Sequence, residues 1–460
     1  MEPRRRDTRE DGLIPTGSGS GRAIVIGPYR RRVPSRGASS PHPQQNERAP
    51  AARLEEAVGL AGAIDLEVVS SGVVPINVVR PATYMGTGKV DEIAGLVKSL
   101  EAGIVIADCA LSPVQQRNLE KAWNAKVLDR TGLILEIFGR RATTKEGSLQ
   151  VELAHLTYQR SRLVKSWTHL ERQRGGFGFL GGPGESQLEI DRRLIGERIA
   201  RIEDELEKVK KRRKLHRDSR ARVPYPIAAL VGYTNAGKST LFNRLTKASV
   251  LQADMLFATL DPTLRSVQLP GGMKFILSDT VGFISDLPTM LVAAFRATLE
   301  EVIEADVILH VRDVSHEDTE AQSRDVEQVL SALGIDPNEE QRLIEVWNKV
   351  DRLDADGRTR LENLAERRPL DQRPVLVSAL TGQGTEALVK AIEARLALRR
   401  VVLDLAVDPA DGAGMSWLHR NTEVMEKSLG EDGKMAMTVR VDPAKANAVR
   451  AKFPALAPSP

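Results

Sequence analysis

Residues Gly232–Thr240 read GYTNAGKST, and no other stretch of the chain says more about its architecture. The first eight residues match the pattern G-x-x-x-x-G-K-[ST], in which glycines let backbone N–H groups face phosphate oxygens. The apolar run Pro226–Val231 before it predicts a buried strand, and Ser239–Leu245 predicts a helix. Lys238 would bring its charge to the outer phosphates, and the Ser239 hydroxyl would bind Mg²⁺. The expected phosphate-loop residues are Gly232, Tyr233, Thr234, Asn235, Ala236, Gly237, Lys238 and Ser239.

A second motif, NKVD, predicts which base is bound. A carboxylate at Asp351 accepts hydrogen bonds from the N1–H and 2-amino group of guanine, whereas adenine would leave it unpaired. The run Pro374–Val377 predicts a further strand, after which backbone groups would support the guanine carbonyl. The expected base contacts are Asn348, Lys349, Val350, Asp351, Ser378, Ala379 and Leu380. Together with the phosphate loop, this motif predicts a site for GTP and GDP.

The motif DTVG follows the apolar run Lys274–Leu277, so it is expected at a strand end. Asp279 would hold Mg²⁺ through water, and the Gly282 N–H would meet the γ-phosphate. A threonine upstream, either Thr259 or Thr263, would complete the Mg²⁺ shell while the γ-phosphate is present. The expected nucleotide-contacting residues of these two segments are Phe257, Ala258, Thr259, Leu260, Asp261, Asp279, Thr280, Val281 and Gly282.

The catalytic set is incomplete. Many small GTPases carry a glutamine directly after D-x-x-G to orient the attacking water, but this chain has Phe283. Slow intrinsic hydrolysis is therefore expected, with Lys238, Asn235 and Gly282 as the predicted catalytic residues. Asn235 resembles the asparagine of potassium-assisted GTPases, which makes K⁺ a hypothetical second cofactor. The alternative, that Asn235 serves only the loop backbone, stays open.

Composition limits the class of protein. The 460 residues are 41% hydrophobic, enough for several domains with cores, and the single cysteine, Cys109, excludes a disulfide framework. No apolar run approaches the roughly 18–20 residues that cross a bilayer, and the N-terminal charges precede no apolar core. We expect a cytoplasmic monomer without integral membrane insertion, and peripheral membrane association stays open. The net charge is only +4, but residues 208–222 hold nine Lys and Arg, which indicates nucleic acid or a solvated helix face.

Five regions are predicted along the chain. Residues 1–21 form a disordered tail, 22–148 an N-terminal α/β domain with a disordered loop at about 30–52, 149–222 a helical hairpin with a basic linker, 223–400 a GTPase domain, and 401–460 a small α+β domain. The N-terminal strands are expected at Ala23–Gly27, Leu66–Val69 and Ile104–Ala107, and its helices at Arg53–Ile64, Lys89–Leu100 and Pro113–Trp123. In the GTPase domain, strands are expected also at Val307–Val311 and Leu343–Trp347. The C-terminal domain is expected to contain strands Val401–Val407 and Met435–Val441 and helices Ser416–Ser428 and Lys445–Lys452.

The hairpin prediction depends on helical spacing of apolar residues. Leu156, Leu163, Trp167 and Leu170 recur on the first helix, and Ile195, Ile199, Ile202, Leu206 and Val209 form a coiled-coil-like seam on the second. The loop between them, Arg172–Gly184, has six glycines and two phenylalanines, Phe177 and Phe179. Glycine permits close approach to a partner, and aromatic rings stack on unpaired bases, so the loop indicates RNA contact. A mobile linker is the alternative.

As a set, these motifs resemble the HflX-type GTPases: the hairpin loop followed by ESQLEIDRR, with GYTNAGKST, FATLD, DTVGF and NKVD, together with TYMGTGK at Thr83–Lys89 and the segment Asp129–Arg141. The resemblance covers roughly residues 22–440. It implies a GTPase that binds the large ribosomal subunit and its rRNA, inserts the hairpin loop near the peptidyl-transferase centre, and splits stalled or idle ribosomes. It also implies that Thr259 is the Mg²⁺ ligand beside Ser239, and that adenine nucleotides such as ATP bind as well. One departure is GGPGE at Gly181–Glu185, where the family commonly has RGPGE.

Two other functions stay open from the residues. One is a GTPase of RNA modification or ribosome assembly, which would bind free RNA tightly. The other is an interaction scaffold that binds nucleotide and hardly hydrolyses it, as Phe283 would allow. Stimulation of turnover by ribosomes distinguishes the expected function from the scaffold.

Overall fold

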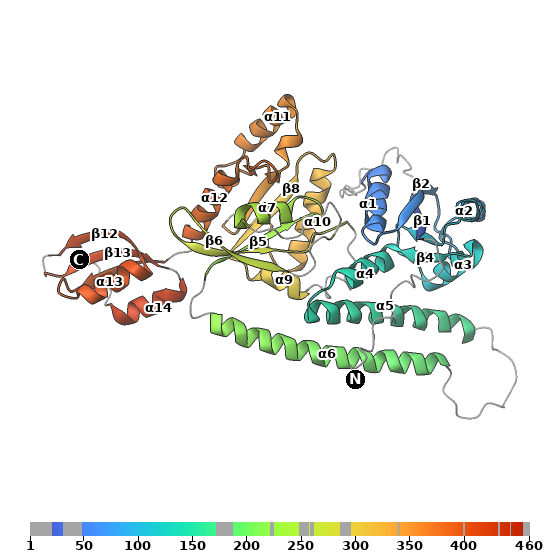
Figure 1. Ribbon diagram of the computed structural model, residues 1–460, viewed down its shortest axis with the longest axis horizontal. Coiled ribbons are helices and arrows are strands. Elements are labelled where there is room, and N and C mark those ends of the chain that lie inside the picture. The colour runs from blue at the N-terminus through green and yellow to red at the C-terminus, as the bar shows by residue number, and fades with distance from the viewer. Residues whose placement is uncertain are drawn as a thin grey trace, which may run out of the picture.

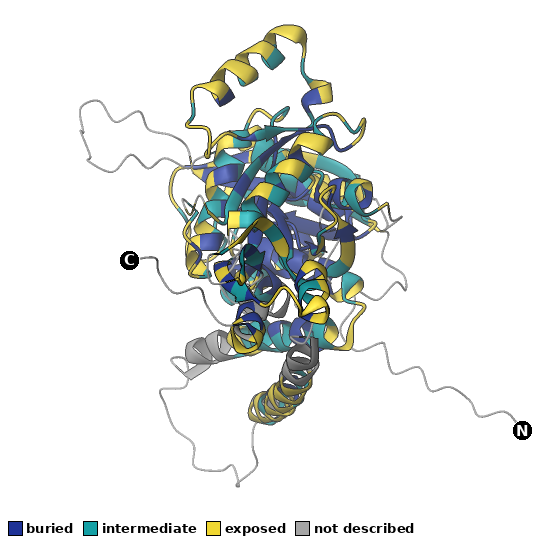
Figure 2. Ribbon diagram, turned by 90° about the vertical axis from the view of Figure 1, so that its left-hand side faces the viewer, coloured by how far each residue is buried: buried dark blue, intermediate teal, exposed yellow. Residues whose placement is uncertain are grey.

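The computed structural model describes residues 21–30, 48–171, 187–220, 225–247, 257, 262–285, 296–337, 339, 341–398, 401–430, 433–441 and 443–453. Three sheets follow one another along the chain, and a pair of long helices lies beside the first two (Figure 1). Buried residues concentrate in the sheets of the central body (Figure 2). The predicted class, a P-loop α/β domain between an α/β domain and a small domain with an antiparallel sheet, is confirmed. Within the described part of the chain, no helix has the length and apolar character needed to cross a bilayer.

The N-terminal sheet is entirely parallel, in the order β2-β1-β3-β4. Its strands are β1 (Arg22–Arg30), β2 (Glu67–Ile76), β3 (Ile104–Ala107) and β4 (Lys126–Asp129), and its helices are α1 (Pro50–Gly62), α2 (Thr87–Ser99), α3 (Pro113–Trp123) and α4 (Arg130–Arg141). Helix α3 begins where Ser112 and Gln115 form a reciprocal capping box and Pro113 occupies the first turn. Helices α2 and α3 cover one face of the sheet, and α1 and α4 cover the other.

The predicted disordered loop at about 30–52 is wrong at its end. Arg48 lies within the described residues, its side chain is only 6% exposed, and α1 already begins at Pro50. Ion pairs hold Arg48 to Glu56, eight positions further on, and to Asp325, which is 277 positions away. Composition cannot reveal such pairing. Residues 31–47 and the tail at 1–20 lie outside the described part.

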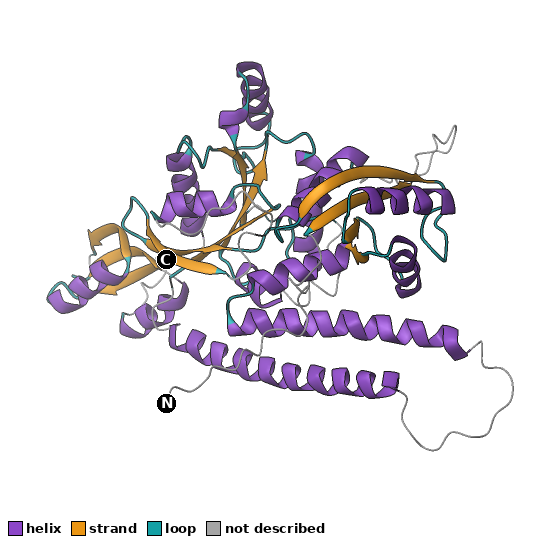
Figure 3. Cartoon of the chain, turned by 45° about the vertical axis from the view of Figure 1, so that its right-hand side comes forward, coloured by secondary structure: helices purple, strands orange, loops and turns teal. Residues whose placement is uncertain are grey.

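The helical hairpin consists of α5 (Lys145–Glu171) and α6 (Gln187–Arg220), which run side by side in opposite directions (Figures 1 and 3). Ile202 and Leu206 on α6 are buried against Leu149 on α5, as the seam predicted. Arg198 and Glu152 form an ion pair across the two helices, 2.7 Å apart. The basic run continues as helix to Arg220, so most of the predicted linker is helical. The glycine-rich loop, with residues 172–186, lies outside the described residues.

The central sheet has the order β10-β9-β8-β5-β7-β6, and only β6 runs antiparallel to its neighbour. Its strands are β5 (Ile227–Gly232), β6 (Thr263–Gln268), β7 (Lys274–Asp279), β8 (Val307–Asp313), β9 (Leu343–Asn348) and β10 (Val375–Leu376). The helices are α7 (Lys238–Thr246), α9 (Arg296–Ile303), α10 (Thr319–Ala332), α11 (Ala355–Glu366) and α12 (Thr385–Leu398), with a 3₁₀ turn, η1, at Val350–Arg352. Helices α7 and α12 pack on one face, and α9 and α10 on the other. Strand β6 was not predicted because its residues TLRSVQ are mostly polar, as an edge strand allows.

The C-terminal sheet is antiparallel, in the order β11-β13-β12. Its elements are β11 (Val401–Val407), α13 (Gly412–Asn421), β12 (Glu423–Leu429), β13 (Met435–Val441) and α14 (Pro443–Lys452). The predicted helix Ser416–Ser428 is therefore wrong in its second half. The residues EVMEKSL favour helix locally, but pairing with β13 makes them a strand, because tertiary contacts outweigh intrinsic propensity.

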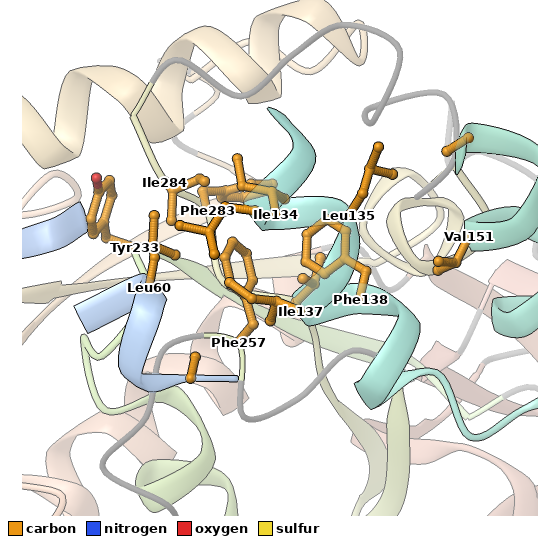
Figure 4. Close-up of a cluster of buried hydrophobic side chains, with 14 of the residues drawn as sticks. Leu60, Ile134, Leu135, Ile137, Phe138, Val151, Tyr233, Phe257, Phe283 and Ile284 are labelled. Carbon is orange, nitrogen blue, oxygen red and sulfur yellow. The ribbon is translucent and has the colours of Figure 1, made fainter. Parts of the chain in front are cut away.

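A hydrophobic core joins the first two domains. Figure 4 shows Ile134, Ile137 and Phe138 of α4 pointing towards Phe257 and Phe283 of the central domain. The rings of Phe138 and Phe257 meet edge to face, with centroids 4.8 Å apart. Because such buried aromatic contacts resist separation, α4 is firmly seated on Phe257, which precedes β6, and it shares the same core with Phe283, which follows β7.

Candidate functional site

The phosphate loop leaves β5 through positions that only particular residues can occupy. Gly232 has φ +154° and Gly237 has φ +91°, and a Cβ at either would collide with Val311 O or Asn348 Nδ2 respectively. Asn235 has φ +59°, a left-handed conformation that asparagine tolerates better than most residues. The side chain of Asn235 is exposed at the tip of the loop. The backbone thus requires glycine at 232 and 237, and its left-handed φ at 235 is enough to account for asparagine there, whatever else these residues do.

Lys238 lies at the centre of this loop. Its Nζ donates to Tyr233 O at 2.8 Å and Gly232 O at 3.2 Å. Burial lowers the pKa of Lys238 to about 8, although the carboxylate of Asp279 partly offsets the shift. A Cβ at Gly282 would stand 3.0 Å from Lys238 Nζ, so Lys238 and Gly282 face each other across the loop. The two residues assigned to the outer phosphates are therefore adjacent.

The structure also brings together two of the predicted metal-binding groups. Ser239 Oγ donates to Asp279 Oδ2 at 2.7 Å, although 40 positions separate the residues. A hydroxyl and a carboxylate oxygen are the ligands that Mg²⁺ prefers, so the residues present fit this ion. Thr263 begins β6 and is paired with Asp279 across the β6–β7 register. Thr259 lies outside the described residues, as do Ala258, Leu260 and Asp261.

The base-recognition motif is fixed to the phosphate loop through Asn348. Its Nδ2 donates to Ala236 O at 2.8 Å, and its Oδ1 accepts from Ala379 N at 2.9 Å. Lys349 has φ +66° and pairs with Asp313 at 2.7 Å. The Asp351 side chain is on η1 and exposed, as a residue that reads a base edge must be before the base arrives. Asn348 thus links the phosphate loop to the loop after β10 by hydrogen bonds.

The loop after β10 completes the part of the site that is expected to bind the base. Ser378 is buried, and its Oγ accepts from Thr381 N at 3.1 Å. Arg244 of α7 donates to Ala379 O at 3.2 Å and also to Leu380 O. The sequence did not identify Arg244, which holds this loop against the helix that follows the phosphate loop. Thr280, Val281 and Val350 are buried beside these elements.

Phe257, a predicted nucleotide contact, and Phe283, the residue after DTVG, both have a packing role. Phe257 is 2% exposed and Phe283 is 1% exposed, and both lie in the core shared with α4 (Figure 4). Phe283 is also anchored by its backbone, because Phe283 N donates to Gly232 O and Phe283 O accepts from Thr234 N. Where other GTPases place a water-orienting side chain, this chain has an anchor into the neighbouring domain.

A buried polar network was missed at the sequence level. The Tyr233 hydroxyl, within the phosphate loop, donates to Glu56 of α1, and accepts from Arg48 at 2.7 Å and from Ser285 N at 2.8 Å. Burial raises the pKa of Tyr233 well above its usual range, and the negative charge of Glu56 adds to this. Burial alone would raise the pKa of Glu56, but Arg130, Tyr233 and Arg48 together hold it below its usual value. No local pattern marks these residues, since their partners are far apart in sequence.

Comparison with known proteins identifies the family. Four family models match in succession: "GTP-binding GTPase N-terminal" at 51–139, "GTP-binding GTPase Middle Region" at 141–220, "50S ribosome-binding GTPase" at 227–349 and "HflX C-terminal domain" at 363–458. The chain belongs to the HflX family of GTPases. The resemblance drawn from the motifs is therefore confirmed.

Relatives named GTPase HflX align over most of their length. The protein of Magnetococcus marinus is 50% identical over 381 residues, covering 82% of this chain and 86% of the relative. That of Escherichia coli is 45% identical over 388 residues, covering 84% and 88%. A solved structure described as SsGBP in complex with GDP covers 81% of this chain and 97% of its own, with 24% identity and a TM-score of 0.47.

Membership of the HflX family accounts for the site. The phosphate loop, Asp279 and Asn348 lie within the residues matched by the GTPase model, and hydrogen bonds join Asp279 and Asn348 to the phosphate-loop residues Ser239 and Ala236. The individual roles of the site residues stay predictions.

Proposed function

We propose that this HflX-family protein hydrolyses GTP slowly by itself, is stimulated by the large ribosomal subunit, and dissociates stalled or idle ribosomes. The observation that carries the proposal is one buried core that contains Val151 of the hairpin helix α5, Phe138 of α4 and Phe283, which follows the residue expected to sense the γ-phosphate. The model described as a 50S ribosome-binding GTPase, matched at 227–349, supports the choice of partner.

In the nucleotide site, the residues of this chain bind and orient the phosphates, the base and Mg²⁺. Loop N–H groups and Lys238 would hold the phosphates, and Asp351 would select guanine. Ser239 and Asp279 would hold Mg²⁺, which neutralises phosphate charge when bound. The Gly282 N–H would follow the γ-phosphate and relax after its loss. Thr259 is proposed as the further Mg²⁺ ligand.

Slow turnover follows from the packing of Phe283. A phenylalanine that is 1% exposed cannot orient water, so another group must complete the site. We propose that docking on the ribosome supplies it or rearranges the segment after Gly282. A scaffold with little turnover is the second candidate, and the same observation favours it if ribosomes have no effect.

The hairpin provides the RNA-binding part of the proposal. Helix α6 carries a basic C-terminal part from Lys208 to Arg220, and in the sequence the glycine-rich loop connects α5 to α6. Contacts of Lys and Arg with rRNA phosphates release counterions, so affinity should fall steeply between about 50 and 200 mM salt. A shallow dependence on salt would contradict the assignment of the basic part of α6.

Potassium is proposed as a second cofactor through Asn235. The exposed Asn235 side chain at the loop tip could contribute an oxygen ligand, while the φ of +59° alone also accounts for asparagine there. Turnover in K⁺ and in Na⁺ at equal ionic strength separates the two roles. Equal rates, with Asn235→Gly active in both, would assign Asn235 to the backbone only.

The deciding experiment measures GTP turnover with and without purified large subunits in K⁺ buffer. A variant lacking Gly175–Gly184 is compared with one in which the same residues are replaced by a Gly/Ser linker of equal length. Strong stimulation of the intact protein, lost in both variants, supports the proposal, and sedimentation of whole ribosomes with GTP would show dissociation. Absence of stimulation, with tight binding to free RNA instead, would favour a role in RNA modification or ribosome assembly. Competition by ATP in the same assay tests adenine-nucleotide binding. We propose further that the protein works as a monomer in the cytoplasm.

A further inference from the structure

The first turn of α4 contacts the hairpin with one residue and the nucleotide-binding domain with the next. Asp129, the N-cap of α4, accepts from Gly132 N at 2.8 Å and from Leu111 N at 3.2 Å. Its carboxylate also accepts from the Tyr158 hydroxyl at 2.6 Å and from Arg162 at 2.7 Å, both on α5. The Asp129 carboxylate is 2% exposed, so the start of α4 and the hairpin helix are joined in a dry environment.

The neighbouring residue, Arg130, extends to the opposite side. Its Nη2 donates to Ser285 O at 2.9 Å and to Ser285 Oγ at 3.0 Å, three residues after Gly282. The same guanidinium pairs with Asp108 at 2.5 Å and with Glu56. Because the Ser285 carbonyl belongs to the main chain, Arg130 holds the backbone of this segment and not only a side chain.

Burial makes this arrangement sensitive to geometry. The side chains of Arg130, Glu56 and Asp108 are 7%, 8% and 1% exposed. Charges removed from water are tolerated only when their partners remain in place, so loss of one contact leaves the others uncompensated. Glu56 further connects to the phosphate loop through the Tyr233 hydroxyl. A shift of α5 relative to the phosphate loop must therefore strain a contact of Asp129 or of Arg130.

We propose that Arg130 is a positioning residue that couples the state of the nucleotide to the hairpin helix α5. The Gly282 N–H must approach the γ-phosphate, and Ser285 is within about 10 Å of chain from it. Movement of this segment is transmitted through Arg130 and Asp129 to Tyr158 and α5. By thermodynamic reciprocity, a displacement of α5 changes the affinity for the γ-phosphate by the same factor.

The proposal deepens the proposed function, since it explains how a target of the hairpin would act on hydrolysis, but it is testable without any target. Free protein is compared in complex with GDP and with a non-hydrolysable GTP analogue. Hydrogen exchange of the backbone amides is followed in α4 and in α5. Affinities for both nucleotides are measured by fluorescence, and melting temperature reports folding.

The variants separate positioning from packing. Arg130→Lys keeps the charge but cannot bond Glu56, Asp108 and Ser285 together. Tyr158→Phe removes one bond on the hairpin side and serves if Arg130→Lys folds poorly. Arg140→Met is the matched control, because Arg140 is on the same helix and, within the described part of the chain, donates to Ile64 O and to Asp65 and not to Ser285 or α5.

In the wild type and in Arg140→Met we expect exchange in α5 to differ between the two nucleotides. In Arg130→Lys the difference should vanish, and the preference for the GTP analogue over GDP should change by at least about fivefold, the low end of allosteric couplings. The double variant with Tyr158→Phe should show no additional change in that preference, because both substitutions break the same connection.

Two results would overturn the proposal. One is a wild-type protein whose α5 exchange is the same with both nucleotides. The other is an Arg130→Lys variant that keeps the wild-type difference, which would assign Arg130 to packing alone. Failure of ribosomes to stimulate turnover would remove the proposed function but would leave this coupling intact, so the two failures are distinguishable.

Discussion

Replacing Asn348 by alanine should weaken GDP binding more than it destabilises the free protein. Asn348 is 1% exposed and joins the phosphate loop to the base-binding loop through Ala236 O and Ala379 N. The alanine variant loses both bonds and leaves a carbonyl and an N–H without partners. In the free protein these loops can separate until water reaches both groups. Nucleotide binding forces them together again, and the loss then appears in affinity.

The size of the effect follows from the two bonds. Each contributes about 1 kcal/mol, and each partner left buried costs about 1–3 kcal/mol more. Since relaxation lets one partner reach water, the two lost bonds and the one partner still buried give an expected loss of about 3–5 kcal/mol in the free energy of GDP binding. Every 1.4 kcal/mol is about a factor of ten, so the Kd should rise roughly 100- to 4,000-fold.

Fluorescence titration with a labelled GDP measures the Kd, and thermal melting without nucleotide measures the effect on the free fold. Asn421→Ala is the matched control, because this asparagine bonds Trp417 O at 2.9 Å in the C-terminal domain, far along the chain from the site. It should leave the Kd unchanged. If Asn348→Ala lowers the melting temperature but changes the Kd by less than about threefold, the reasoning about the tie between the loops is refuted.

Three further predictions concern the same site. Asp351→Asn should weaken GTP binding by at least about 100-fold. The same variant should bind xanthosine triphosphate better than the wild type does, because the 2-carbonyl of xanthine accepts a hydrogen bond from the asparagine amide. Competition titration measures both affinities, and an unchanged GTP affinity would show that Asp351 does not recognise the base. Gly282→Ala should weaken binding of a GTP analogue at least about tenfold more than GDP, because the added Cβ would lie 2.9 Å from Thr234 Cγ2 and 3.0 Å from Lys238 Nζ; equal losses for both nucleotides would contradict this. Burial lowers the pKa of Lys238 to about 8 despite Asp279, whereas a bound phosphate favours the ammonium form. GDP affinity should therefore fall as the pH rises from 8 to 9, and binding of GDP in this range should take up close to one proton. Calorimetry in buffers of different ionisation enthalpy counts that proton, and no uptake at pH 8.5 would be evidence against the assignment.

Local sequence was sufficient for most of the fold. Strand β11 and helix α3 were predicted with the bounds that the structure shows, because each carries its own pattern: alternation in Val401–Val407 and a cap with Pro113 in α3. The predicted strand before the phosphate loop and the one before DTVG were also found. The prediction failed where the secondary structure of an element depends on a neighbour, as in β12, whose residues become a strand only by pairing with β13.

The site shows the same division. Lys238, Ser239, Asp279 and Asn348 could be named from motifs, and the fold brings them together at the ends of β5, β7 and β9. Sequence also suggested a missing catalytic group at Phe283, but not that this side chain is an anchor into α4.

The sequence by itself determined that this is a guanine-nucleotide site on a P-loop sheet, attached to a helical hairpin, because the residues of each motif are consecutive and their chemistry requires no knowledge of the fold. Only the tertiary structure decided what the site is connected to. Tyr233 and Glu56 are 177 positions apart, and Arg130 and Ser285 are 155 apart. Contacts over such separations are made by the packing of whole domains, and burial then makes each charge depend on partners that no local pattern records.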